Sequence, residues 1–125
     1  GIAEASILTA MTFCQRFGIL SILSKSVPRH MRYVGAMGVM DRLAADLPLE
    51  LGVLELTDET RTFERLKAVG EALRDTAMAD VVILGCAGMT AFRTDLEQHL
   101  GLPVIEPCQA AVAMAIGQVA LQTTR

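Results

Sequence analysis

The residue best placed by its neighbours to do acid–base chemistry is Cys86. It follows an apolar run, Val81–Leu84, and is flanked by Gly85 and, two residues on, by Gly88. A short continuous apolar run is typical of a buried parallel strand, so we expect the thiol at the carboxyl end of a strand. A helix should begin near Thr90, and its positive end would favour a thiolate over a thiol. Cys86 is therefore a candidate acid or base.

The same cysteine also has a structural interpretation. A cysteine after a strand is often a small buried apolar residue. The glycines beside it, Gly85 and Gly88, suit either a tight turn or the close approach of a ligand to the backbone. The other two cysteines, Cys14 and Cys108, lie in a helix–strand connection and at the start of an apolar helix, and we interpret them as packing residues.

Polar side chains follow the first predicted strand. The hydroxyl groups of Ser21, Ser24 and Ser26 could bind a carbonyl or carboxylate of a ligand, or they could cap the next helix. His30, beside Arg29, could contact an anionic ligand, or it could stand in solvent at the start of that helix.

Several common kinds of site are not indicated. The glycines near Cys86 lack the GxGxxG spacing, and no Gly-Lys-Ser/Thr loop occurs, so we expect no phosphate-bearing cofactor. Neither His30 nor His99 has cysteines at metal-ligand spacing, and no motif presents a histidine to the thiol as in a cysteine protease. Glu106, before Pro107, is either a site carboxylate or one stabilised by a helix dipole.

The composition describes a folded domain that does not bind nucleic acid. The 125 residues are 52% hydrophobic and 20% charged, and the net charge of −3 has no basic cluster beside it. Three cysteines form no disulfide framework, so we expect reduced thiols and a cytoplasmic protein. No apolar segment reaches the roughly 18 to 20 residues that span a membrane. The first residues do not form a signal peptide and resemble the interior of a longer chain.

Strand-like and helix-like segments alternate along the chain. We predict strands at residues 17–22, 51–56, 81–85 and 103–106, and helices at residues 2–11, 28–46, 60–77, 91–100 and 107–121. This alternation predicts an α/β fold, with a four-stranded parallel sheet flanked by helices. A strand order of 2-1-3-4 would place Cys86 at the switch point, where open α/β sheets bind their ligands.

The two terminal helices are apolar on nearly every side. A helix of this kind must be covered on every side, and a sheet of four strands is too small to cover both. Either the chain self-associates through these helices, or they pack on a domain that this sequence lacks.

Three stretches carry a family resemblance. Ile-Leu-Gly-Cys-Ala-Gly-Met at 83–89, Leu-Gly-Leu-Pro-Val-Ile-Glu-Pro at 100–107 and Ala-Ala-Val at 110–112 resemble the second half of the Asp/Glu/hydantoin racemase superfamily. The opening Gly-Ile-Ala-Glu-Ala, and Phe-Gly-Ile-Leu-Ser at 17–21 with Ser-Val-Pro at 26–28, are similar to hydantoin racemases. The resemblance runs through almost the whole chain and keeps the order and spacing of these stretches.

The resemblance implies a mechanism without a cofactor. Family members have two similar α/β lobes, and each contributes one cysteine to a shared cleft. One thiolate removes the proton from the carbon alpha to a carbonyl, and the opposite thiol returns a proton to the other face. Cys86 matches the second-lobe cysteine, and the backbone N–H groups around Ala87 and Gly88 would hold the substrate carbonyl and the developing enolate. Ser21 falls near the cleft.

The substrate class follows from a departure within the motif. Glutamate racemases carry Cys-Thr-His-Tyr-Pro after the glycine and aspartate racemases Cys-Thr-Glu, whereas this chain has Ala87, Gly88 and Met89 after Cys86. This favours a small-molecule substrate of the hydantoin or allantoin type, and a carboxylate substrate stays possible.

Nothing in the sequence corresponds to the first lobe. We therefore expect residues 1–12 to be a helix of that missing lobe, residues 13–106 to form the second lobe, and residues 107–125 to return to the first. We also expect a homo-oligomer and little racemisation by this chain alone. Two alternatives are an arylmalonate decarboxylase-like enzyme that uses the single cysteine, and a non-catalytic module that dimerises through its terminal helices.

Overall fold

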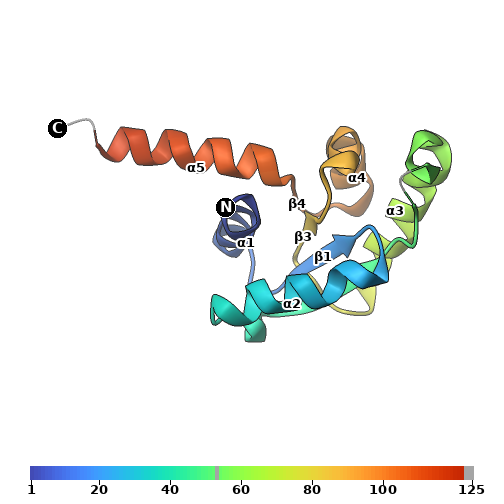
Figure 1. Cartoon of the computed structure of the whole chain (residues 1–125), viewed down its shortest axis with the longest axis horizontal. Coiled ribbons are helices and arrows are strands. Elements are labelled where there is room, and N and C mark those ends of the chain that lie inside the picture. Colours follow the sequence, from blue (N-terminus) through green and yellow to red (C-terminus); the bar gives the residue numbers. More distant parts are fainter. Residues whose placement is uncertain (53, 123–125) are drawn as a thin grey trace.

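The computed structural model describes residues 1–52 and 54–122, and its centre is a parallel sheet (Figure 1). Its four strands are β1 Phe17–Ser21, β2 Leu43–Pro48, β3 Val81–Leu84 and β4 Val104–Ile105. They lie in the order β2-β1-β3-β4, and each neighbouring pair is parallel. The predicted α/β class, the four-stranded parallel sheet and the 2-1-3-4 order are confirmed.

Helices connect the strands and begin or end at local signals. The five α-helices are α1 Ile2–Phe13, α2 Val27–Ala36, α3 Glu59–Asp75, α4 Arg93–Leu100 and α5 Pro107–Leu121; short 3₁₀ turns are η1 Ser24–Ser26, η2 Met40–Arg42, η3 Glu55–Thr57 and η4 Ala87–Phe92. The Asp58 carboxylate caps α3 by accepting the Arg61 N–H, and Gly101 ends α4 with a φ of 69°.

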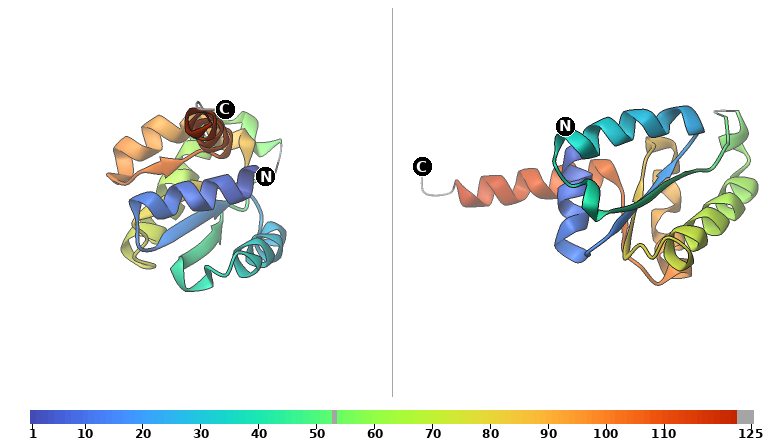
Figure 2. Two further views of the ribbon diagram at one scale, coloured as in Figure 1. Left: turned by 90° about the vertical axis from the view of Figure 1, so that its left-hand side faces the viewer. Right: turned by 90° about the horizontal axis from the view of Figure 1, so that it is seen from below.

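Alternate strand residues build two separate cores, because successive side chains of a strand point to opposite faces. Leu20, Val82 and Leu84 face α3 and α4 in one core, whereas Ile19 and Ile83 lie with α1 and α2 in the other. The sheet is thus the middle of three layers, with helices on both faces (Figure 2).

The second strand was predicted in the wrong place. The predicted helix 28–46 ends at Ala36, and Gly38 follows it with a φ of 71°. The spacing of apolar residues beyond Gly38 suits a helix, but a residue in the left-handed region stops one. β2 then pairs with β1, and Asp46 lies opposite Ile19.

The segment predicted as that strand, residues 51–56, forms no strand in the part that the structure describes. Residue 53 lies outside the described residues. Leu51 is buried beside the end of β1, where its N–H donates to the Ile22 carbonyl, whereas Leu54 is 85% exposed. The apolar residues of this segment therefore belong to a loop and not to one buried strand.

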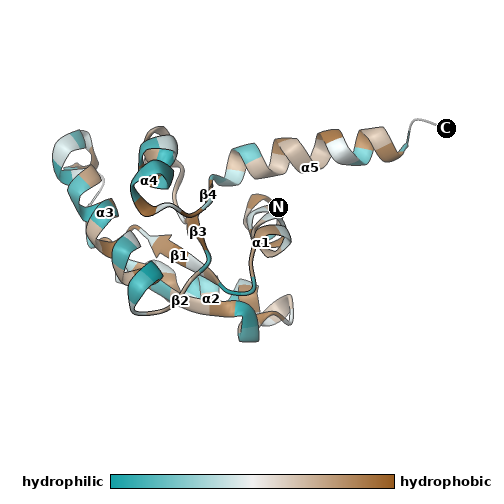
Figure 3. Ribbon diagram, turned by 180° about the vertical axis from the view of Figure 1, so that it is seen from behind, coloured by the Kyte–Doolittle hydropathy of each residue, from teal (hydrophilic) through white to brown (hydrophobic). Residues whose placement is uncertain are grey.

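The terminal helices contact each other, and α5 joins the core beside the sheet through its first turns. α1 buries Ile7 and Ala10 in the core on the α2 side, together with Ala110 of α5. α5 then extends away from the rest of the molecule (Figures 1 and 2), and its outer turns are mostly apolar (Figure 3). Val112, Ile116 and Val119 are 59–66% exposed. Among the described helices, none has the length and apolar character needed to cross a membrane.

Candidate functional site

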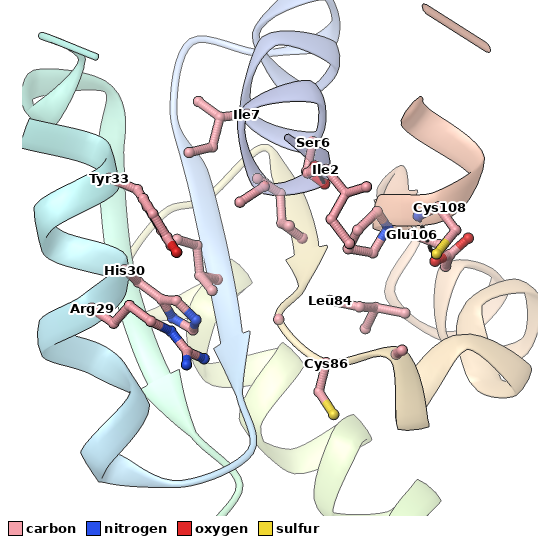
Figure 4. A pocket seen from close by; sticks show the side chains of 16 residues that line it. Ile2, Ser6, Ile7, Arg29, His30, Tyr33, Leu84, Cys86, Glu106 and Cys108 are labelled. Atoms are coloured by element: carbon pink, nitrogen blue, oxygen red, sulfur yellow. Dashed lines mark hydrogen bonds between the residues drawn. The ribbon is translucent and has the colours of Figure 1, made fainter. Parts of the chain in front are cut away.

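A cavity of about 210 Å³ opens at the carboxyl ends of β1 and β3, the switch point of the sheet. The end of β3 contributes Gly85, Cys86 and Ala87, while α1, α2 and the start of α5 contribute its walls: Ile2, Ala3, Ser6, Ile7, Arg29, His30, Tyr33, Glu106, Pro107 and Cys108. Figure 4 shows Arg29 and His30 on one side of the cavity and Glu106 and Cys108 on the other.

Cys86 lies at this edge, partly exposed, as the sequence predicts. Its Sγ accepts a hydrogen bond from the Gly88 N–H at 3.4 Å, and its carbonyl accepts one from the Met89 N–H at 3.1 Å. Both bonds fix the turn into η4, which precedes α4 and occupies the first two residues of the helix predicted at 91–100. The thiol therefore faces a backbone amide at the start of a short helix.

The other predicted site residues occupy different surroundings. Ala87 lines the cavity beside the thiol, and Gly88 lies beyond the lining, with its N–H directed to Cys86. Ser21 is fully buried, and its hydroxyl donates to the Asp46 carboxylate. Ser21 can therefore act on a ligand only through its neighbours.

A buried polar cluster joins β1, α2 and β2 under the cavity. Nδ1 of His30 lies 2.7 Å from Oδ2 of Asp46 and 3.0 Å from Oγ of Ser21. The Asp46 side chain has no exposed surface and the His30 side chain is 11% exposed. Sequence reasoning missed Asp46 because it placed this residue in a helix. The available signal was an isolated carboxylate within the apolar stretch 43–49.

This Ser–His–Asp cluster is not a hydrolase relay. In such a relay the serine hydrogen-bonds one ring nitrogen of the histidine and the aspartate holds the other. Here Ser21 and Asp46 both contact Nδ1 of His30, and the Ser21 hydroxyl donates to the carboxylate. A buried hydroxyl in this arrangement cannot attack a substrate, so the cluster positions the imidazole.

Gly85 allows the histidine to lie against the end of β3. A Cβ atom at Gly85 would lie 2.6 Å from the Leu20 carbonyl oxygen and 3.3 Å from Cε1 of His30. The Gly85 N–H also donates to that carbonyl at 2.8 Å, which holds β1 and β3 together. The glycine before Cys86 is thus required by packing as well as by the turn.

Glu106 caps α5, and it also lines the cavity. Burial opposes the charge of its carboxyl group, but hydrogen bonds from the Cys108 and Gln109 N–H groups outweigh burial and hold its pKa below the ordinary value. Glu106 is therefore a buried carboxylate at the wall of the cavity.

The remaining cysteines differ in environment. All three cysteines of the chain are free. Cys14 is buried in the core under α1, and burial, together with nearby Asp80, raises the pKa of its thiol, partly offset by Arg42. Cys108 is exposed and lines the cavity. Within the described ranges, no three His, Cys, Asp or Glu side chains group as metal ligands.

Comparison with known proteins assigns the family. The family model for Asp/Glu/hydantoin racemase matches residues 1–115 of this chain. The chain belongs to the Asp/Glu/hydantoin racemase family. A hydantoin racemase from Paenarthrobacter aurescens is 40% identical over 124 residues, which cover 97% of this chain and 52% of that protein. The chain thus spans about half the length of the curated relatives it matches.

Solved structures of the family share the fold. The allantoin racemase from Pseudomonas fluorescens superimposes with a TM-score of 0.91 at 30% identity, over 97% of this chain and 52% of that one. A Gly74Cys mutant of arylmalonate decarboxylase matches with a TM-score of 0.64 at 18% identity, over 92% of this chain and 50% of that one. At this identity the second comparison shows a common fold alone.

Proposed function

We propose that this chain supplies one lobe of a cofactor-independent racemase and that Cys86 is its acid–base residue. The observation that carries the proposal is the position of the thiol in a racemase-family chain. Cys86 lies at the switch point of the sheet, lines the cavity and accepts the Gly88 N–H. This hydrogen bond holds the sulfur at the start of η4, at the edge of the cavity.

The proposed step is a proton transfer at carbon. The Cys86 thiolate takes the proton from the carbon alpha to a carbonyl, and the electron pair of the broken C–H bond moves onto the carbonyl oxygen as an enolate. A thiol on the opposite face then gives its proton to that carbon as the carbonyl re-forms. The Ala87 N–H, beside the thiol on the cavity lining, would stabilise the enolate oxygen, while the Gly88 N–H holds the thiol.

The substrate class that we propose is a 5-substituted hydantoin or a related cyclic ureide such as allantoin. Relatives that carry these names support the proposal. The cavity offers apolar surface from Ile2 and Ile7 for a substituent, with polar groups from α2 opposite. Arg29 at the same wall would suit a substrate with a carboxylate.

The opposite thiol belongs, in this proposal, to the first lobe of the two-lobed fold. The chain spans about half of its relatives, and the outer turns of α5 leave Val112, Ile116 and Val119 uncovered. We infer that α5 and the exposed side of α1 face that lobe, while the buried side of α1 packs on the sheet formed within residues 13–106. Residues 123–125, which the domain prediction included, lie outside the described residues. Alone, the chain should cover this apolar surface by self-association, which sedimentation velocity would detect.

A chimera tests the proposal. This chain would replace the aligned part of the Paenarthrobacter aurescens hydantoin racemase, and racemisation of each enantiomer of 5-benzylhydantoin would be followed by polarimetry. We expect the chimera to racemise, the isolated chain to show little activity, and Cys86→Ala in the chimera to abolish it. Cys14→Ala is the matched control and should keep activity. A folded Cys86→Ala chimera that racemises at the parent rate would refute the role of Cys86.

A further inference from the structure

We infer that His30 determines specificity by accepting, through Nε2, a hydrogen bond from a ring N–H of the substrate. The inference rests on the proposed function, because it takes a cyclic ureide as the substrate. It concerns a residue on α2, apart from the cysteine motif at the end of β3, and it gives the buried Ser21 and Asp46 a positioning role.

The contacts at Nδ1 fix which nitrogen of the ring carries the hydrogen. Oδ2 of Asp46 lies 2.7 Å from Nδ1, and a carboxylate can only accept. The Ser21 hydroxyl gives its own hydrogen to Oδ1 of Asp46, so it too can only accept from Nδ1. Nδ1 of His30 therefore carries the hydrogen, and in the neutral ring Nε2 holds a lone pair.

Nε2 is the ring nitrogen of His30 that is left for a ligand. Among the residues that the structure describes, none hydrogen-bonds this nitrogen, whereas Nδ1 has two partners. The ring lines the cavity, and its Cε1 edge lies against Gly85. The lone pair is thus presented to a ligand from a ring that is 11% exposed and held by buried groups.

The Cys86 thiol is not the partner of this nitrogen. Cys86 packs against the core on the α3 and α4 side of the sheet, and its Sγ accepts the Gly88 N–H. His30 lies on the α2 side, and Figure 4 shows the Cys86 sulfur pointing away from the imidazole. Both residues line the cavity, so a ligand within it can meet Cys86 at one atom and a hydrogen-bond acceptor at another.

An acceptor in this position selects for a donor on the ligand. A hydantoin carries one ring N–H next to its reacting carbon and another between its two carbonyl groups. A buried acceptor left without a donor costs free energy. Sites built to bond an N–H reject analogues that lack it more strongly than apolar pockets reject a missing methylene group. His30 would therefore favour hydantoins with free ring N–H groups over N-alkylated hydantoins and over open-chain esters.

Nitrogen NMR of the isolated chain directly tests whether Nδ1 of His30 carries the ring hydrogen. With ¹⁵N-labelled histidine, we expect the neutral form of the His30 ring to show a protonated Nδ1 and an unprotonated Nε2. The His99→Ala variant assigns the two histidines, because His99 is exposed on α4 and lies outside the cavity. A His30 ring with its hydrogen on Nε2 would overturn the inference.

Ligand titration tests whether Nε2 of His30 accepts a hydrogen bond from a ring N–H of the ligand. We expect 5-methylhydantoin to shift the His30 Nε2 resonance and to bind roughly tenfold more weakly to His30→Ala. The derivative methylated at both ring nitrogens should bind the parent and His30→Ala chains equally, and His99→Ala should match the parent for both ligands. Asp46→Asn, which lets Nδ1 accept and moves the hydrogen to Nε2, should also lose affinity for 5-methylhydantoin.

Outcomes against the inference are distinct from failure of the proposed function. Equal binding of the two hydantoins, an unchanged affinity in a folded His30→Ala chain, or no response of Nε2 to 5-methylhydantoin would each overturn the role of His30. None of these results bears on Cys86, because racemisation by the chimera and its loss in Cys86→Ala are read separately. If the chimera were inactive while the isolated chain still showed the Nε2 response, the racemase proposal would be refuted. The hydrogen bond from a ligand N–H to His30 would still stand.

Discussion

Oδ2 of Asp46 lies 2.7 Å from Nδ1 of His30, although the two residues come from different elements, β2 and α2. The pairing arises from strand register. Asp46 lies opposite Ile19, and residues of parallel strands in register share a face, so its side chain points to the α2 side of the sheet. Ser21 points to the same side from the end of β1. Its hydroxyl donates to Asp46 and lies 3.0 Å from Nδ1 of His30, so the three side chains form one hydrogen-bonded cluster.

Removing the Asp46 carboxylate should destabilise the fold. Asp46→Ala leaves the Ser21 hydroxyl and the His30 ring without their acceptor, and we expect the free energy of unfolding to fall by about 1–3 kcal/mol. Asp95→Ala is the matched control, because Asp95 is exposed on α4 and should change stability by less than about 0.5 kcal/mol. Urea unfolding followed by circular dichroism measures both. Equal stability of the two variants would contradict the buried cluster.

Gly85 should not tolerate a side chain. In Gly85→Ala the new Cβ would meet the Leu20 carbonyl oxygen at 2.6 Å, so we expect a loss of about 1–3 kcal/mol and a displaced His30 ring. Gly35→Ala is the control within α2, where the nearest atom is a Met40 methyl carbon at 3.8 Å. That variant should gain up to about 1 kcal/mol from helix propensity. Thermal unfolding should show a lower melting temperature for Gly85→Ala and a higher one for Gly35→Ala. An unchanged melting temperature in Gly85→Ala would refute the close approach of Gly85 to the Leu20 carbonyl.

Glu106 should make stability depend on pH in the acid range. Its folded-state pKa is lowered, so its contribution is present above the ordinary carboxyl pKa of about 4.3 and is lost as pH falls through the lowered value. Glu106→Gln should be less stable than the parent by about 1 kcal/mol at pH 7, and the difference should vanish at acid pH. Glu59→Gln, exposed in the first turn of α3, is the control. Chemical denaturation at several pH values tests this, and a constant difference would contradict it.

Cys14 and Cys108 should react at different rates with iodoacetamide. Cys14 is buried and its pKa is raised, so both access and thiolate fraction are low, and we expect it to react at least tenfold more slowly than the exposed Cys108. Mass spectrometry of timed digests gives each rate, and denaturant should equalise them. Fast native alkylation of Cys14 would show that α1 does not cover it.

The sequence allowed the sheet and the thiol to be predicted because their signals are local. The apolar run Val81–Leu84 and the glycines around Cys86 mark a buried strand and a turn within eight residues, and the structure has both. The amphipathic pattern of α3 and the glycine after α4 are equally local. The placement of the Cys86 thiol at the switch point then followed from topology.

The second strand and the polar cluster could not be predicted in this way. Apolar spacing beyond Ala36 fits a helix, and only pairing with β1 shows that residues 43–48 are extended. The contacts of Asp46 reach across 16 residues to His30 and 25 to Ser21, so no local pattern contains them. If β2 is not placed, Asp46 has no partner, and the sequence leaves Ser21 free to bind a ligand.

Proton exchange at the reacting carbon is the most direct test of the central claim, that Cys86 transfers a proton at the carbon alpha to a carbonyl. Each enantiomer of 5-benzylhydantoin would be incubated separately with the chimera in D₂O, and deuterium at C5 followed by NMR against a protein-free blank. We predict that Cys86→Ala abolishes exchange from the enantiomer whose hydrogen faces Cys86, while Cys14→Ala exchanges both enantiomers like the parent. Exchange of both enantiomers at the parent rate by a folded Cys86→Ala chimera would contradict the account.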